Sequence, residues 1–262
     1  AAGGCRTTGK IKMLLAIWSY RHFISAAIMG ELRARYARSR LGLLWSVLHP
    51  LAQALIFALV LSKVLGAKLS GVEHDAAYPI YLLSGIAAWN LFSEILGRCL
   101  NVFVEYSSAL KKIAFPRICL PMIVWGGALI NHVLLLVAIA VIFLFLGFTP
   151  SITWLALPLG ILFISLFAFG LGVILGLFNV FSRDIGQALT VVLQLWFWMT
   201  PVVYPIAIVP DNLLPILELN PMVALVGIYH DALLYKTWPD IGSLIWPALI
   251  AVTLFGAAFV LF

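Results

Sequence analysis

Seven residues near the start of the chain come closest to a catalytic motif. Residues 4–10 read GCRTTGK and match the phosphate-binding loop G-x-x-x-x-G-K-[ST] until its last position, where Ile11 replaces the required Ser or Thr. That hydroxyl is needed because it ligates the Mg²⁺ ion of the bound nucleotide. We therefore attribute the match to chance and predict that this chain holds no cofactor of its own, neither ATP nor Mg²⁺.

Other residue types that carry catalysis or bind metals are scattered. The cysteines are Cys5, Cys99 and Cys119, whose spacings match no zinc or redox motif, and the five histidines show no metal-ligand spacing. The sequence contains neither HExxH nor GxSxG. Residues 118–182 carry no Asp, Glu, Lys or Arg, so a buried proton relay would have only His132 there. We predict no catalytic residue and no metal site, and we expect a partner to supply the energy for any uphill transport.

The composition is that of a membrane protein. Hydrophobic residues make up 64% of the chain and charged residues 10%, where soluble domains have about 45–50% and about 25%. The mean hydropathy is +1.11. The net charge of +6 does not indicate a nucleic-acid partner, because the basic residues flank apolar runs instead of gathering on a polar surface. We predict an all-α membrane protein.

Six apolar runs reach the length of about 20 residues that a helical span needs. We predict spans at residues 41–62, 77–103, 119–147, 152–180, 185–204 and 241–262 of a single transmembrane domain that covers residues 1–262. The remaining segments are an N-terminal arm (11–40), a connection rich in basic residues (105–118) and a proline-rich region of short re-entrant or interfacial helices (205–239).

The distribution of Lys and Arg predicts the orientation. With six spans, 13 of these residues fall on the side of the termini, and three, Lys63, Lys68 and Lys236, fall on the other. Cytoplasmic loops carry the excess of basic residues. We therefore expect a multi-pass protein of the cytoplasmic (inner) membrane with both termini in the cytoplasm.

The N-terminal arm combines an apolar stripe with a basic cluster. Helical spacing relates Leu14, Ile17, Tyr20, Ile24 and Ile28. Arginines follow at positions 33, 35, 38 and 40, and anionic lipid head groups attract such residues by roughly 1 kcal/mol each. We favour a helix that lies on the membrane surface in contact with its lipids. The alternative is the first helix of the bundle.

Two features inside the predicted spans also have two interpretations each. Glu94 and Arg98 are four residues apart and share a helix face, either as an ion pair at the membrane interface or as a functional pair within the membrane. Aromatic residues gather in the second and fifth spans, either as an interfacial belt and packing or as a surface that stacks on sugar rings. Those that we assign to the second interpretation are Trp89, Phe92, Trp196, Trp198 and Tyr204.

Four segments together resemble a known family. Residues 30–50 read GELRARYARSRLGLLWSVLHP and residues 110–117 read LKKIAFPR, followed by Leu120-Pro121. Residues 179–184 read NVFSRD, and residues 200–205 read TPVVYP, with Asn220-Pro221 after them. In this order and spacing they resemble the polysaccharide ABC exporter permeases, a family that includes O-antigen, capsule and wall teichoic acid exporters.

The resemblance implies a homodimer of six-span subunits, each docked on one of two copies of a separate ATPase subunit that holds ATP and Mg²⁺. It implies an ATPase-coupling helix that contains Lys111, Lys112, Phe115, Pro116 and Arg117. It also implies an entrance where Arg33, Arg35 and Arg38 bind a lipid-linked diphosphate, and a glycan channel lined by the aromatic residues named above.

The implied function is the export of a lipid-linked polysaccharide, with O-antigen favoured, by a subunit that is not itself an enzyme. Capsule, teichoic acid, drug and lipid cargoes remain alternatives within the same transporter class. A secondary carrier or a membrane-embedded enzyme is an alternative from another class, and buried acids or histidines would have favoured it.

Overall fold

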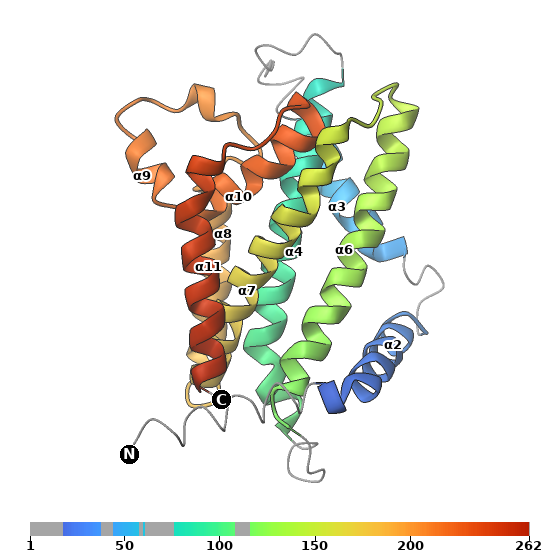
Figure 1. Ribbon diagram of the computed structural model, residues 1–262, viewed down its shortest axis with the longest axis vertical. Coiled ribbons are helices and arrows are strands. Elements are labelled where there is room, and N and C mark those ends of the chain that lie inside the picture. Colours follow the sequence, from blue (N-terminus) through green and yellow to red (C-terminus); the bar gives the residue numbers. More distant parts are fainter. Residues whose placement is uncertain (1–17, 38–43, 58–59, 61–75, 108–115, 262) are drawn as a thin grey trace.

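The chain is a bundle of helices in the computed structural model (Figure 1). The structure describes residues 18–37, 44–57, 60, 76–107 and 116–261, without the side chains of residues 35–37, 46 and 47. The α-helices are α2 (Arg21–Ala37), α3 (Leu44–Phe57), α4 (Ala77–Glu105), α6 (Cys119–Phe145), α7 (Leu157–Asn179), α8 (Asp184–Trp198), α9 (Leu214–Glu218), α10 (Pro221–His230) and α11 (Ile241–Leu261). Short 3₁₀ or π turns occur at η2 (Ile152–Ala156), η3 (Ile206–Ile208) and η4 (Asp231–Tyr235).

Four of these helical segments are long and apolar enough to cross a membrane: α4, α6, η2 with α7, and α11. Their bounds lie within two residues of four predicted spans, and the predicted all-α membrane protein is confirmed. The other two predicted spans, 41–62 and 185–204, contain α3 with 14 residues and α8 with 15. Both helices are shorter than the roughly 20 residues of a full span, so the count of six stays a prediction.

Helix α4 is the centre of the bundle. It packs against α3, α6, α7, α8 and α10, and most of its side chains are buried. Glycines of α7 allow the closest of these contacts, because a Cβ atom at Gly176 would lie 2.6 Å from the carbonyl oxygen of Cys99. Gly170 lies equally close to α11, where a Cβ atom would be 2.5 Å from the carbonyl carbon of Leu254. Small residues at helix contacts let backbones approach in this way inside membranes.

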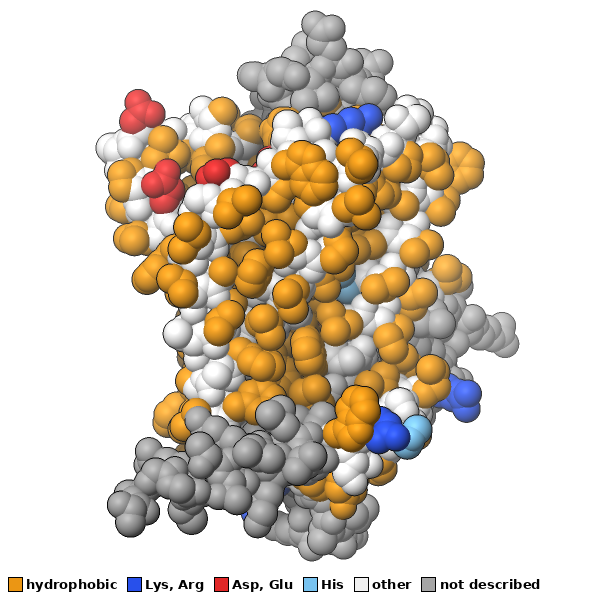
Figure 2. Space-filling model, in the orientation of Figure 1, with side chains coloured by type: hydrophobic (Ala, Val, Ile, Leu, Met, Phe, Trp, Pro, Cys, Tyr) orange, Lys and Arg blue, Asp and Glu red, His pale blue; other side chains and the backbone are white. Residues whose placement is uncertain are grey.

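The face of the bundle drawn in Figure 2 is mostly apolar between its two ends. Large hydrophobic side chains of α6 and α11 are exposed, including Val141, Leu144, Leu249 and Val252. Soluble monomers rarely expose so many large hydrophobic side chains together, and the hydrocarbon of a bilayer would cover them.

The two ends of the bundle differ. Helix α2, the last turns of α4, α7 and α11 and the first turns of α6 and α8 lie together at what we call the basal end (Figure 1). The opposite, distal end holds α9, α10 and η4, and acidic side chains gather over α9 on the face shown in Figure 2. The exposed acids of this region are Asp211, Glu218 and Asp240.

Tyrosine hydroxyls of α4 hold the irregular segment that follows α8. Tyr81 donates to the carbonyl oxygens of Pro201 at 2.9 Å and Tyr204 at 2.7 Å. Tyr78 donates to the carbonyl of Val203 at 2.8 Å. These bonds satisfy backbone carbonyls that no helix satisfies, which is a requirement for irregular chain at membrane depth.

Helix α2 packs on the base of α6. Ile24 lies against Cys119 and Ile123, and Ile28 lies over Gly126. The side chains of Trp18 and Phe23 are exposed. The arm therefore contains the predicted helix, with Ile24 and Ile28 of the apolar stripe on α6, while Leu14 and Ile17 lie outside the described residues.

Candidate coupling site at the base of the bundle

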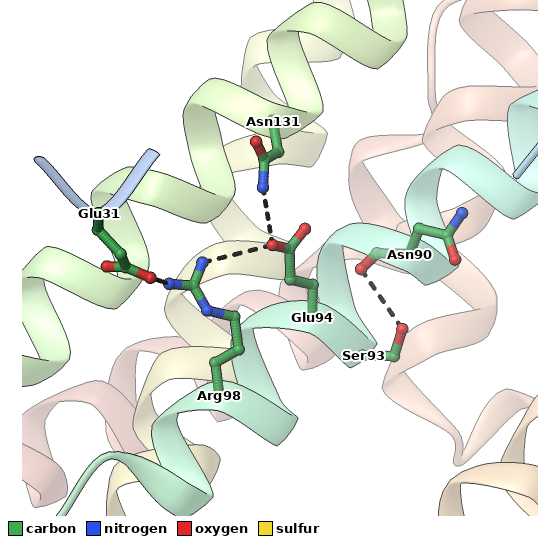
Figure 3. A network of polar contacts seen from close by, with 6 residues as sticks. All are labelled: Glu31, Asn90, Ser93, Glu94, Arg98 and Asn131. Carbon is green, nitrogen blue, oxygen red and sulfur yellow. Dashed lines mark hydrogen bonds and ion pairs between the residues drawn. The ribbon is translucent and has the colours of Figure 1, made fainter. Parts of the chain in front are cut away.

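Four polar side chains meet where α2, α4 and α6 come together (Figure 3). The Arg98 guanidinium forms an ion pair with Glu31 of α2 and a second one with Glu94, at 3.4 Å from Nη1 to Oε1. Asn131 of α6 donates from Nδ2 to the same Glu94 oxygen at 2.9 Å. We call Glu31, Glu94, Arg98 and Asn131 the basal network.

The sequence positions each member of this network. Glu94 and Arg98 are one helical turn apart on α4, so they share the face that meets α2 and α6. Gly127 of α6 lies beside the guanidinium, since a Cβ atom there would be in van der Waals contact with Arg98 Nη1 at 3.4 Å. The ion pair predicted between Glu94 and Arg98 is confirmed, and it extends to two further helices.

The network is partly shielded from solvent and carries unequal charge. The side chains of Arg98, Glu31 and Glu94 are 19%, 25% and 26% exposed. One guanidinium faces two carboxylates, and Glu31 Oε2 is buried without a hydrogen-bond partner in the described part of the chain. In such surroundings a charged side chain needs a partner of opposite charge, because desolvation makes an unpaired ion costly. Arg98 therefore holds the two acidic side chains, and with them two helices, in place.

The predicted coupling residues lie beside this network in the chain. Lys111, Lys112 and Phe115 lie outside the described residues. Pro116 is half-buried and Arg117 is exposed, and their carbonyl oxygens accept from the backbone N–H groups of Cys119 and Leu120, which begin α6. The connection thus joins the two helices, α4 and α6, that carry Arg98 and Asn131.

The predicted diphosphate residues belong to α2 and the segment after it. Arg33 is exposed on α2, two positions after Glu31. Arg35 lies on α2, but its side chain and all of Arg38 fall outside the described residues. The structure therefore places Arg33 near the basal end and leaves the grouping of the three arginines untested.

Of the five predicted channel aromatics, four are buried or half-buried and Trp198 is exposed. Phe92 is fully buried, stacks on Phe167 with ring centroids 5.4 Å apart, and meets the Trp196 ring edge-on at 5.1 Å. Trp89 packs on Phe92 at 5.4 Å.

Trp198 is the last residue of α8, and Tyr204 is half-buried in the irregular segment that follows. Trp198 is 54% exposed, and the Tyr204 hydroxyl donates to its carbonyl oxygen at 3.0 Å. Packing accounts for Phe92 and Trp89 within one chain. The channel role of the five residues stays a prediction.

Two asparagines, from the motif at residues 179–184 and from Asn220-Pro221, stabilise turns between successive helices. Asn220 caps α10 by accepting from Met222 N at 3.0 Å, and its Oδ1 also accepts from Trp196 Nε1 at 2.9 Å. Asn179 is 3% exposed and accepts from Gly186 N at 3.2 Å across the turn between α7 and α8. The motifs of the sequence therefore coincide with positions that hold successive elements together.

Glu31 and Asn131 were missed by the sequence analysis. Glu31 is the only acid among the first 40 residues, within a basic arm, and that isolation was the available signal. Asn131 is a polar residue in a long apolar run, which in membranes indicates a partner or a function.

A comparison with protein families identifies the chain. The family model described as ABC-2 type transporter matches residues 22–234, a range that contains the basal network and all four motifs. The chain belongs to the ABC-2 type transporter family.

Curated relatives narrow the group within the ABC-2 family. An O-antigen export system permease protein of Myxococcus xanthus is 30% identical over 250 residues, which cover 95% of this chain and 94% of that protein. One of the same name from Klebsiella pneumoniae is 29% identical and covers 79% and 78%. A polysialic acid transport protein of Escherichia coli is 25% identical and covers 80% and 81%. The resemblance to polysaccharide ABC exporter permeases is thereby confirmed.

Proposed function

We propose that this ABC-2 chain is the permease subunit of an ABC exporter that moves a lipid-linked polysaccharide, O-antigen in the first place, across the cytoplasmic membrane. The observation that carries the proposal is the match to the Myxococcus xanthus O-antigen export permease over nearly the whole of both chains. The apolar face of the bundle (Figure 2) and the four candidate spans are consistent with it.

A separate ATPase subunit would drive the export. ATP and Mg²⁺ would bind on that partner, and the connection with Lys111, Lys112, Phe115, Pro116 and Arg117 would dock on it. Two features support this assignment. The connection is rich in basic residues, and it joins α4 to α6, whose side chains meet in the basal network. A displacement of the connection would therefore be transmitted to α4 and α6 and, through Glu31, to α2.

The working assembly would be a homodimer of six-span subunits with two ATPase copies. Helix α8 supports a partner within the membrane, because only Leu189 and Phe197 of its 15 residues are buried in one chain. Both α3 and α8 are too short to cross alone, so adjoining residues would complete their spans. Both termini would be cytoplasmic, in keeping with α2 and the end of α11 at the same end of the bundle.

The cargo would enter near the basal end and pass between the subunits. Arg33, Arg35 and Arg38 would attract the diphosphate of the lipid-linked glycan. The exposed face of Trp198 would be available to stack on sugar rings. Replacing the three arginines by Gln should abolish export while the ATPase stays bound, and unchanged export would remove this role.

Purification of the tagged chain from its native membrane tests the main proposal. We expect one ATPase subunit per copy of this chain, and a deletion strain that accumulates a lipid-linked glycan on the cytoplasmic side. The absence of an ATPase, or transport by the purified chain without nucleotide, would contradict the proposal. The similarity to the polysialic acid transport protein makes a capsular glycan the second candidate, and the chemistry of the accumulated glycan decides between them.

A further inference from the structure

A polar cavity of about 400 Å³ opens at the basal end, on a different set of helices from the basal network. It lies between the last turns of α4 and α7 and the first turns of α8. Its polar lining consists of Asn101, Asn179, Arg183, Gln187 and Thr190. The volume falls in the range of roughly 300–1,000 Å³ that is usual for small-molecule sites. Of the described residues assigned to coupling or to the α2 arginines, Pro116, Arg117 and Arg33 do not line it.

Internal hydrogen bonds fix part of this lining and leave another part free. The Asn179 amide donates to the carbonyl of Leu100 at 3.2 Å and to Asn101 Oδ1 at 3.3 Å. The side chains of Arg183 and Gln187 are exposed, and neither takes part in a hydrogen bond or ion pair among the described residues. A guanidinium and an amide therefore face the cavity with their donors unused.

These donors suit the oxygens of a phosphate. Guanidinium groups bind phosphate oxygens through two parallel N–H···O bonds, and an adjacent amide adds another donor. Asp184, the nearest acid in the chain, does not line the cavity, and its carboxylate accepts from the Ser182 hydroxyl at 3.3 Å. Among the described residues, the cavity lining thus carries one positive charge and no negative one.

Exposed apolar side chains stand directly beside this polar lining. Phe178, in the last turn of α7, is 56% exposed, and Val180 and Phe181, on the turn between Asn179 and Arg183, are 54% and 89% exposed. The candidate span that contains α7 ends at Asn179, so the turn lies at the membrane boundary. A ligand with a phosphate and a hydrocarbon chain satisfies both surfaces at once.

We propose that this cavity binds the phosphate of a membrane lipid, with Arg183 and Gln187 on the phosphate oxygens and the lipid chain along Phe178 and Phe181. The site goes beyond the proposed function, which places the cargo diphosphate on α2 and assigns no role to the Asn179–Asp184 motif. The phosphate can belong to an anionic phospholipid or to a prenyl diphosphate of the kind that carries glycans.

Native mass spectrometry of the full chain in detergent tests the site with two probes, dioleoyl phosphatidylglycerol and geranylgeranyl diphosphate. We expect Arg183→Gln to weaken binding about tenfold and Gln187→Ala to weaken it by a smaller factor, as hydrogen bonds to a charged group require. The matched control is Arg21→Gln, which removes the same charge from α2 at the same end. Thermal unfolding of each variant shows that the fold is retained.

Each outcome either assigns the lipid bound at the site or overturns the proposal. A loss confined to phosphatidylglycerol assigns the site to membrane phospholipid, and a loss confined to the prenyl diphosphate assigns it to the cargo lipid. A loss for both supports a general lipid-phosphate site. Unchanged affinities, or an equal loss in Arg21→Gln, would overturn the proposal. None of these measurements depends on transport, so their failure leaves the proposed function standing.

Discussion

Arg98 and Glu31 are 67 residues apart in the chain, yet their side chains form an ion pair that joins α4 to α2. The same guanidinium also reaches Glu94, which in turn accepts from Asn131 of α6. A surface helix is thus tied to the two helices that flank the proposed coupling connection. The pair offers a route by which a displacement at that connection can move the arm that bears Arg33.

Removal of the Arg98 guanidinium should weaken the attachment of α2 to α4. We expect Arg98→Gln to lower the free energy of unfolding by about 3 kcal/mol, because two partly buried carboxylates lose their counter-charge. Glu31→Gln should cost less, since Glu94 remains paired. Thermal unfolding in detergent measures both variants and the double variant. Additive losses in the double variant would show that the two side chains do not interact.

The same variants separate a structural role from coupling. If the basal network transmits motion between the helices, Arg98→Gln should lower glycan export per molecule of ATP hydrolysed by the assembled complex. Arg21→Gln serves as the charge-matched control, because Arg21 is exposed at the same end but lies outside the basal network. Equal export per ATP in the Arg98 variant and wild type would restrict Arg98 to a stabilising role.

The contact between α4 and α7 should tolerate no side chain at Gly176. A Cβ atom there would meet the Cys99 carbonyl oxygen at 2.6 Å, so Gly176→Ala should destabilise the fold by about 1–3 kcal/mol. Gly97→Ala is the matched control, because the same atom at Gly97 meets nothing within 4 Å. This control should be neutral or stabilising by up to about 1 kcal/mol, as expected for a helix interior. Similar unfolding temperatures for the two variants would refute the close approach.

The Tyr81 hydroxyl should matter more than that of Tyr78. Tyr81→Phe leaves the carbonyls of Pro201 and Tyr204 without this donor, whereas Tyr78→Phe affects one carbonyl. We expect losses of about 2–3 kcal/mol and about 1–2 kcal/mol in unfolding free energy. Tyr20→Phe, at an exposed ring directly before α2, provides the control. The reverse order of the two losses would contradict the hydrogen-bond assignment.

Asp240 should make the start of α11 sensitive to acid. Its carboxylate accepts from Ser243 N at 2.9 Å and Gly242 N at 3.3 Å, and these bonds lower the pKa of Asp240 below its usual value. A lowered pKa in the folded state means that the stabilisation is present above the unfolded pKa of about 3.9 and is lost as the pH falls through the folded value.

Asp240→Asn keeps a cap acceptor but removes the titrating group. The variant should therefore lose less stability than wild type when the pH falls from 6 to 3, as measured by thermal unfolding. Asp211→Asn, an exposed acid of the distal end without such bonds among the described residues, should follow the wild-type curve. A wild-type slope in Asp240→Asn would exclude the cap as the source.

Sequence patterns predicted those features of the fold that depend on residues close together in the chain. The predicted spans 119–147 and 152–180 leave a gap after residue 147, and the structure has a positive φ of 76° at Gly147, after the end of α6. The pairing of Glu94 with Arg98 also followed from helical spacing. The predicted fifth span ran to residue 204, but α8 ends at Trp198, where the chain turns back toward Tyr78 and Tyr81.

Partners from distant segments could not be predicted from the sequence. Helical periodicity shows which face of α4 bears Arg98, but not that α2 supplies Glu31 or that α6 supplies Asn131. The same applies to the phosphate cavity, since Asn101 and Arg183 meet only because α7 approaches α4 closely enough to bring the α7–α8 turn alongside it. The glycines that permit this approach are common in membrane helices and give no sign of their partner.

The glycine contacts of α7 restrict how the bundle can rearrange. On one side Gly176 brings α7 against the backbone of α4, and on the other Gly170 brings it against that of α11. Interlocked backbones cannot slide past one another without a clash, so α4, α7 and α11 should move as one rigid body. A path for a polymer would then open along the margins of this trio and never through its middle.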